Sequence, residues 1–311
     1  MDSASLQQPF DAAVVIPTVL RPTLAQAVQS VYAQDCPGRI QILLGVDKAL
    51  GDRALLDRIR AECPARFALT LVDPGYSTSQ RHGSLYSNHY GGALRTVLSY
   101  LANSRFVAYL DDDTWYAPGH LAALLAAVAG KSWAYSMRTL VDDRLDEVIC
   151  PDEWESVGPG RGVYAAAFGG FVGTTGLMLD KLACHEVLPA WSLSRYARGG
   201  GGEDRMVFER LKSLPHGATG KHTVFYRTTL DGKHPYLLWK YRQAGVDLAR
   251  YMSPDRIPPE SAWAECEAYD RAEQERGSRA QGDVGAPRAM SYEGARYSIS
   301  YPMPTPPGKK P

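Results

Sequence analysis

The first 110 residues alternate between short apolar runs and longer stretches of helical character. The apolar runs are typical of buried strands and lie at residues 12–17, 40–46, 67–72 and 105–110. The stretches with helical spacing or composition lie at residues 23–34, 51–62 and 91–103. Strands that alternate with helices form parallel sheets with right-handed crossovers, so we expect an α/β fold with a mostly parallel sheet flanked by helices.

The second half of the chain is less regular but contains both kinds of segment. Strands are expected at residues 132–141, 174–180 and 222–227, with a hairpin partner of the first near 144–150. Helices are expected at residues 118–129, 202–214, 236–250 and 260–275. From about Gly277 onward the chain is rich in Gly, Pro, Ser and Arg and has no apolar periodicity, so we predict a mostly disordered tail over 278–311.

The composition narrows the classes of function. Lysine plus arginine equals aspartate plus glutamate at 34 each, and a chain without net charge lacks the basic surface expected of a nucleic-acid-binding protein. The five cysteines form no Cys-x-x-Cys pair, which favours reduced thiols over a zinc site or a disulfide framework. The first residues do not resemble a signal peptide, and no apolar run reaches about 18 residues. We therefore expect a cytoplasmic protein with at most peripheral contact with a membrane.

Three consecutive aspartates, Asp111, Asp112 and Asp113, directly follow the apolar strand at 105–110. Like charges this close repel one another unless a positive group is present. Ligands of open α/β sheets bind beyond the carboxyl ends of the strands, and Mg²⁺ and Mn²⁺ prefer oxygen ligands. The run therefore suggests a divalent cation that bridges protein and phosphate oxygens. A turn that caps the helix near Pro118 is the structural alternative.

Two other predicted strands end in residues that suit the same site. Pro17 and Thr18 end the first strand, and Asp47 follows the second. Because the carboxyl ends of parallel strands meet at one crevice, we expect these residues to face the three aspartates. Asp47 can accept hydrogen bonds from a base or a ribose, although an aspartate also suits a turn or a helix cap at this place.

A second acidic pair, Glu203-Asp204, follows four glycines and begins a predicted helix. A carboxylate beside an acceptor hydroxyl can act as a general base, and the N–H groups of a helix start can hold an anion. The same pair also suits the ordinary role of acidic residues that stabilise a helix dipole.

Taken in order, several segments resemble family 2 glycosyltransferases of the GT-A fold, over roughly residues 11–230. The similar segments are VVIPT at 14–18, LLGVD at 43–47, GALRT at 92–96, YLDDDTW at 109–115, GTTGLMLD at 173–180 and GGEDRMVFERL at 201–211. Each segment alone is weak evidence, whereas the ordered set is specific. The resemblance implies a GT-A fold with a single Rossmann-like, mostly parallel sheet and a C-terminal helical extension.

The resemblance also implies a domain organisation. An N-terminal arm (1–10) precedes the catalytic domain (11–235), and C-terminal helices (236–277) and the tail follow it. Within the catalytic domain, a nucleotide-binding half (11–115) precedes an acceptor half (116–235).

The implied activity is metal-dependent transfer of a sugar from a nucleotide-sugar to an acceptor hydroxyl with inversion, in glycan, polysaccharide or glycoconjugate biosynthesis. A UDP-sugar is the first candidate donor, and the acceptor is a glycan, a lipid-linked intermediate or a small molecule. Residues implied to bind the nucleotide are Pro17, Thr18, Asp47, Arg95, Asp111 and Asp112. Asp113 is implied to bind Mn²⁺ or Mg²⁺, and Asp204, with Glu203 beside it, to be the general base. Residues expected on the acceptor and sugar side are Trp115, Gly173, Thr174, Thr175 and Trp191.

The chain departs from the family pattern at two places. Thr96 follows Arg95 where the family often has Asn, and Thr229 occupies the place of a histidine that can be a third metal ligand. His234 is the nearest replacement, and His222 is a weaker one. A structural role is the alternative for either histidine.

Other functions remain open at this point. The chain can be a retaining GT-A transferase, a nucleotidyltransferase or a non-catalytic nucleotide-binding protein of the same fold. A nucleotidyltransferase usually has a Gly-rich loop after the first strand, which VVIPTVLRPT lacks. The loops at 74–89 and 192–202 contain Gly and Ser and suit a lid that closes over a donor.

Overall fold

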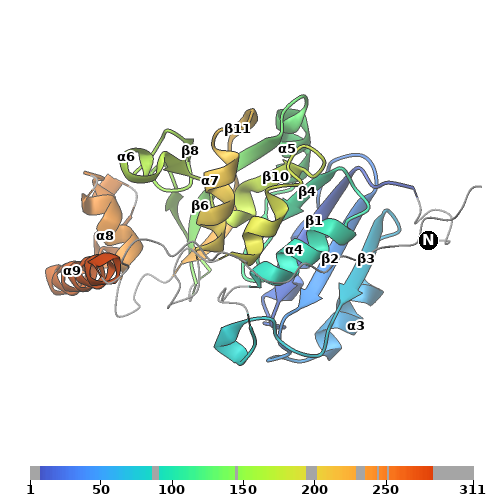
Figure 1. The fold of residues 1–311 in the computed structure, drawn as a ribbon, viewed down its shortest axis with the longest axis horizontal. Helices are drawn as coiled ribbons and strands as arrows, with labels where there is room; N and C mark the ends of the chain where they lie inside the picture. Colours follow the sequence, from blue (N-terminus) through green and yellow to red (C-terminus); the bar gives the residue numbers. More distant parts are fainter. Residues whose placement is uncertain are drawn as a thin grey trace, which may run out of the picture.

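A nine-stranded sheet runs through the protein (Figure 1). The computed structural model describes residues 8–85, 91–143, 146–193, 202–228, 235–243, 245–250 and 252–282. The strands of the large sheet are β1 (Ala12–Thr18), β2 (Ile40–Val46), β3 (Phe67–Val72), β4 (Phe106–Tyr109), β5 (Trp115–Tyr116), β6 (Trp133–Asp142), β7 (Val148–Pro151), β10 (Leu177–Asp180) and β11 (His216–Thr228). Their order is β3-β2-β1-β4-β10-β6-β11-β5, and β7 pairs with β6. A separate two-stranded sheet pairs β8 (Gly158–Pro159) with β9 (Gly170–Phe171).

Most strands of the large sheet run in one direction, as the sequence predicts. The pairs β1–β2, β1–β4, β2–β3 and β6–β11 are parallel. The strand β10 lies antiparallel between β4 and β6, so those two also share a direction. The hairpin expected near 144–150 is the antiparallel pair β6–β7. The carboxyl ends of β1, β2 and β4 therefore meet at one edge of the sheet.

Helices cover both faces of the sheet (Figure 1). The α-helices are α2 (Leu24–Tyr32), α3 (Ala54–Ala61), α4 (Gly92–Leu101), α5 (His120–Val128), α6 (Ala165–Phe168), α7 (Glu203–Leu211), α8 (Tyr236–Gln243) and α9 (Glu260–Gly282). Short 3₁₀ helices are η1 (Gln80–His82), η2 (Thr174–Gly176), η3 (Leu188–Ser192), η4 (Leu248–Arg250) and η5 (Pro254–Arg256).

Two hydrophobic cores lie on the opposite faces of the sheet. Side chains alternate along a strand, so Val14 of β1 packs toward α2, α3 and α5, whereas its neighbour Val15 packs toward α4, η3 and α7. Both valines are fully buried. A strand buried on both faces reads as a continuous apolar run, which is why AAVVIP predicts a strand without alternation.

Several predicted boundaries differ from the observed ones. The expected strand at 174–180 begins with η2, and only Leu177–Asp180 forms β10. The expected strand at 222–227 is the end of the longer β11, which contains register shifts against β6. The helix expected at 236–250 ends at Gln243, before Gly245, whose φ of +84° does not continue a helix.

The C-terminal helices form a third core with β7. Residues of α8 and α9, including Tyr241 and Cys266, pack there against Ile149 and Cys150. The helix α9 continues to Gly282, so our start of the tail at 278 is wrong. Ala, Arg and Gln are good helix formers, and they carry the helix past that residue. The remainder of the predicted tail, 283–311, lies outside the described residues. Among the described residues, no helix is both long and apolar enough to cross a membrane.

Candidate functional site

A cleft of about 640 Å³ lies where the carboxyl ends of β1, β2 and β4 face the start of α7. Of the residues expected in the site, those that line it are Pro17, Thr18, Asp47, Arg95, Asp111, Asp112, Asp113, Thr174, Glu203 and Asp204. They come from segments that are as much as 187 positions apart in the chain, from Pro17 to Asp204. The fold therefore brings the two acidic groups of the sequence to one opening.

Asp112 is held in place by the end of β1. Its carboxylate accepts hydrogen bonds from the hydroxyl of Thr18 (2.7 Å) and the backbone N–H of Val19 (3.2 Å). The Thr18 hydroxyl oxygen accepts in turn from the N–H of Leu20 (2.8 Å). Asp112 is 6% exposed, and burial raises its pKa. This aspartate joins β1 to β4 and has little freedom to bind a ligand.

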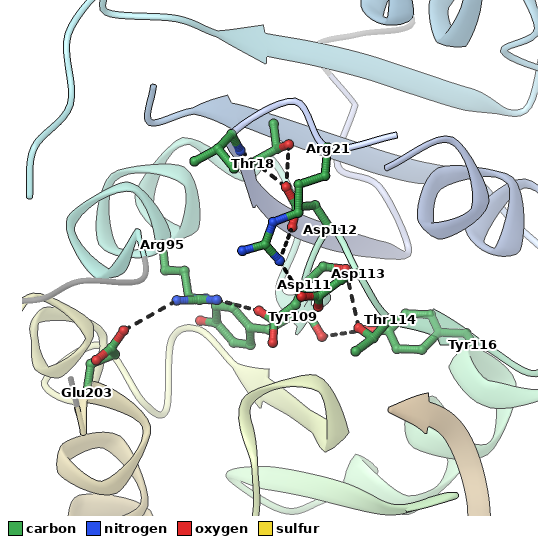
Figure 2. Close-up of polar contacts among 11 residues, drawn as sticks. Thr18, Arg21, Arg95, Tyr109, Asp111, Asp112, Asp113, Thr114, Tyr116 and Glu203 are labelled. Atoms are coloured by element: carbon green, nitrogen blue, oxygen red, sulfur yellow. Dashed lines mark hydrogen bonds and ion pairs between the residues drawn. The ribbon is translucent and has the colours of Figure 1, made fainter. Parts of the chain in front are cut away.

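Asp111 is held by Arg95 of α4 (Figure 2). The guanidinium of Arg95 pairs with one carboxylate oxygen of Asp111, and its other end lies 3.9 Å from an oxygen of Glu203. It also lies over the ring of Trp191, 5.5 Å from the ring centre. Burial lowers the pKa of Arg95, but the carboxylates of Asp111 and Glu203 outweigh it and raise that pKa above its ordinary value. Arg95 therefore stays charged inside the protein.

Glu203 begins α7 and is 3% exposed. Neither of its side-chain oxygens has a hydrogen-bond partner among the described residues. The pKa of Glu203 is raised to about 7, mainly by burial. The charge of Arg95 acts in the opposite direction and offsets part of this rise. Gly202 precedes Glu203 with φ of +75°, a conformation that costs other residues energy. The glycine that ends the run of four thus sets the direction in which Glu203 and Asp204 enter the helix.

Asp204 lines the cleft and is partly buried. Its carboxylate accepts a hydrogen bond from the N–H of Arg205 (2.8 Å). Burial raises its pKa. A carboxylate with a raised pKa is a better proton acceptor than an ordinary one, so Asp204 has the properties of a general base.

Asp113 is the most accessible carboxylate of the three aspartates. Its side chain is 38% exposed, and Arg21 pairs with it. Burial and the charges of Asp111 and Asp112 raise its pKa to about 6 in spite of Arg21. Arg21 alone therefore does not neutralise the negative charge that Asp111, Asp112 and Asp113 place together.

These properties fit a divalent cation that prefers oxygen ligands. Within the described residues, no group of three or more His, Cys, Asp or Glu side chains is arranged to hold a metal ion by itself. Mg²⁺ usually binds through one or two carboxylates together with substrate phosphates, which needs fewer protein ligands. Asp113 suits that role because its side chain is the most exposed of the three.

Asp47 lines the cleft, but its carboxylate also holds the following loop. It accepts hydrogen bonds from the Ser77 hydroxyl (3.0 Å), the Thr78 N–H (3.0 Å) and the Thr78 hydroxyl (3.1 Å). Asp47 is 4% exposed. It therefore orders the loop that contains η1 in addition to facing the cleft.

Several residues expected on the acceptor side do not reach the cleft. Trp191, which we expect on the acceptor side, is fully buried against Tyr109 (ring centres 4.7 Å apart), where apolar packing retains it. Thr175 is 2% exposed, and the N–H of Gly173 donates to the Ser156 hydroxyl (2.9 Å). Only Thr174 of this segment lines the opening.

Trp115 and the histidines require separate comment. Trp115 stacks on Phe225 with ring centres 5.2 Å apart and lies outside the cleft lining. His222 lies within β11 and does not line the cleft either, so it is not positioned as a ligand. His234 lies outside the described residues, as do most of the loop at 192–202 and residues 86–90.

The cleft is also lined by basic side chains that the sequence does not single out. These side chains come from the loop after β1, from η1 and from the end of β11, and they are Arg21, Arg81, His82 and Arg227. Tyr226 lies beside Arg227 in the lining. Arg21 follows Thr18 by three positions, and this closeness to the end of a strand is the sequence feature that could have indicated it as a residue of the site. Nothing in the sequence pairs it with Asp113, which is 92 positions away.

Comparisons with known proteins identify the fold. No family model matches the sequence, and no curated protein matches it. Among solved structures, S. aureus TarS is similar with a TM-score of 0.51 at 12% identity, over 75% of this chain and 38% of TarS. The 1–349 fragment of S. aureus TarS in complex with UDP-GlcNAc is similar with a TM-score of 0.50 at 13% identity, over 82% of this chain and 71% of the fragment.

The chain thus spans well under half of the longer TarS chain. The mannosyltransferase PcManGT from Pyrobaculum calidifontis, in complex with GDP-Man and Mn²⁺, has a TM-score of 0.48 at 16% identity, over 84% of this chain and 70% of that chain. The protein has the mixed α/β architecture of GT-A-like glycosyltransferases.

Proposed function

We propose that this protein is a glycosyltransferase that moves a sugar from a nucleotide-sugar, with a UDP-sugar as first candidate, to an acceptor hydroxyl. One observation carries the proposal. Two differently held acidic groups, Asp111 to Asp113 after β4 and Glu203-Asp204 at the start of α7, line the same cleft. The TarS fragment of the same fold was solved with UDP-GlcNAc, which supports this choice of donor class.

The proposed reaction is a direct displacement at the anomeric carbon. Asp204 accepts the proton of the acceptor hydroxyl while the oxygen of that hydroxyl forms the new bond to the anomeric carbon. The bond from the carbon to the diphosphate oxygen breaks, and the nucleoside diphosphate leaves with the electron pair. Because the hydroxyl attacks opposite the leaving group, the anomeric configuration inverts, as in the family 2 enzymes that the sequence resembles.

The leaving group needs charge neutralisation, which supports a metal-dependent reaction. A Mn²⁺ or Mg²⁺ ion held by Asp113 and the diphosphate would supply that positive charge. Asp112 keeps β4 against β1, and Arg95 holds Asp111, so both aspartates position the nucleotide end of the cleft. Pro17, Thr18 and Asp47 would contact the nucleoside from the ends of β1 and β2.

Glu203 and Thr174 complete the assignment. Glu203 connects α7 to Arg95, which keeps the base Asp204 at a set distance from Asp111. Thr174 is the residue of η2 that would face the sugar or acceptor. For Trp115, Gly173, Thr175 and Trp191 we propose support of this side of the site instead of sugar contact.

A donor-hydrolysis and transfer assay tests the proposal. The protein is incubated with a panel of UDP-, dTDP- and GDP-sugars, with and without Mn²⁺, and release of nucleoside diphosphate is measured. We expect turnover with one donor class that depends on the metal. Absence of both turnover and metal-dependent nucleotide binding with every donor would reject the enzyme, whereas nucleotide binding without turnover would favour the non-catalytic nucleotide-binding protein. The anomeric configuration of the product separates inverting from retaining transfer, and release of sugar 1-phosphate instead of nucleoside diphosphate would indicate a nucleotidyltransferase.

A further inference from the structure

The ion pair between Arg21 and Asp113 lies where the cleft meets a second hollow. The second hollow has a volume of about 560 Å³. Residues that line both spaces are Arg21, Pro22, Asp113, Tyr226 and Arg227. A ligand that fills the cleft up to Asp113 must therefore meet the guanidinium of Arg21.

Arg21 pairs with Asp113 (Figure 2) through a side chain that is far more exposed than that of Arg95, the partner of Asp111. Arg95, which holds Asp111, has a side chain that is 5% exposed, whereas the Arg21 side chain is 50% exposed. Arg21 also approaches Asp112 at 3.5 Å, so one guanidinium serves two carboxylates. Ion pairs between exposed side chains are weak, which makes this contact the easiest of the set to exchange.

We propose that Arg21 and the divalent cation compete for Asp113, and that the donor's diphosphate resolves the competition by taking the guanidinium. This inference rests on the proposed function. A guanidinium pairs well with phosphate oxygens, so Arg21 keeps an anionic partner after it leaves Asp113. The cation then gains Asp113 together with the diphosphate.

The exchange has a thermodynamic consequence. While Arg21 occupies Asp113, the free protein binds the cation weakly. Because nucleotide binding draws Arg21 away, the nucleotide strengthens cation binding, and by reciprocity the cation strengthens nucleotide binding by the same factor. Arg21 is thus a positioning residue that makes the two ligands bind together.

Mn²⁺ binding to the apo protein, followed by electron paramagnetic resonance with and without UDP, tests this role. Replacement of Arg21 by glutamine (Arg21→Gln) should tighten Mn²⁺ binding without UDP by about two- to fivefold, because the competing charge is lost. UDP should then strengthen Mn²⁺ binding less than it does in the unaltered protein. Arg21→Lys, which keeps the charge, should restore most of the original weak Mn²⁺ affinity.

Arg53→Gln is the matched control. Arg53 also pairs with an aspartate, Asp73, and its side chain is 59% exposed, but it does not line the cleft. The Arg53→Gln variant should therefore bind Mn²⁺ as tightly as the unaltered protein. Equal or weaker Mn²⁺ binding by Arg21→Gln, or no Mn²⁺ binding by either protein, would overturn the inference.

The outcome is separable from that of the proposed function. Tighter Mn²⁺ binding by Arg21→Gln in a protein that turns over no donor would support the exchange and reject the transferase. Metal-dependent transfer by a protein whose Mn²⁺ affinity does not change in Arg21→Gln would support the transferase and reject the exchange.

Discussion

Asp111 and Glu203 share one guanidinium, that of Arg95. Asp111 follows the central strand β4, and Glu203 begins α7, so the shared cation joins the two sides of the cleft. The guanidinium pairs directly with Asp111 and lies 3.9 Å from Glu203. The spacing between the nucleotide end and the proposed base thus depends on one buried arginine.

Replacement of Arg95 should destabilise the protein. In Arg95→Gln, the carboxylates of Asp111 and Glu203 lose their common partner, and we expect a loss of about 3–5 kcal/mol in the free energy of unfolding. Urea unfolding measures this loss. Arg58→Gln, at an exposed position of α3, is the control and should change stability by less than about 0.5 kcal/mol. An Arg95→Gln protein as stable as the original would show that the contacts of Arg95 with Asp111 and Glu203 do not stabilise the fold.

Glu203 should make stability depend on pH. Its pKa is about 7 in the folded protein against 4.5 as the ordinary value. Between these values the folded state holds a proton that the unfolded state releases, so stability falls as pH rises from about 4.5 to about 7. The full effect is about 3 kcal/mol. Unfolding of Glu203→Gln and of the original protein at pH 5 and pH 8 should show that the variant loses less stability. Parallel pH profiles would count against a raised pKa.

Asp113 and Asp204 should fail in different ways when altered. Asp113→Ala should lose metal-dependent turnover with the fold retained, because the cation loses its most accessible carboxylate. Asp204→Ala should bind the donor nearly as before and lose transfer by about 10²- to 10⁴-fold, the usual contribution of a general base. Calorimetric donor binding and nucleotide release measure the two effects. Equal loss of donor binding in both variants would contradict this division.

Gly202 should matter for activity more than for stability. Gly202→Ala forces an L side chain into a φ of +75° at the start of α7, which costs about 1–2 kcal/mol. Gly220→Ala carries the same kind of strain at φ +67° in open space within β11. Both variants should lose similar thermal stability, but only Gly202→Ala should lose transfer, by about tenfold or more, because it moves Asp204. Similar activities would show that the glycine does not position the base.

The predictable parts of the site are those that lie at strand ends. Thr18, Asp47 and Asp111 were expected together because parallel strands bring their carboxyl ends to one edge. The antiparallel position of β10 was not predictable in the same way. An apolar run such as LMLD specifies burial, and both strand directions bury it equally.

The sequence by itself determined the buried strands β1 to β4, the helices between them and the edge at which Asp47 meets the three aspartates. It did so because burial and helical periodicity are local properties of neighbouring residues. The tertiary structure alone decided which charges face one another: Arg21 with Asp113, Arg95 with Asp111 and Glu203, and Trp191 with the core instead of the cleft. These contacts join residues far apart in the chain, and they depend on packing distances that no local pattern encodes.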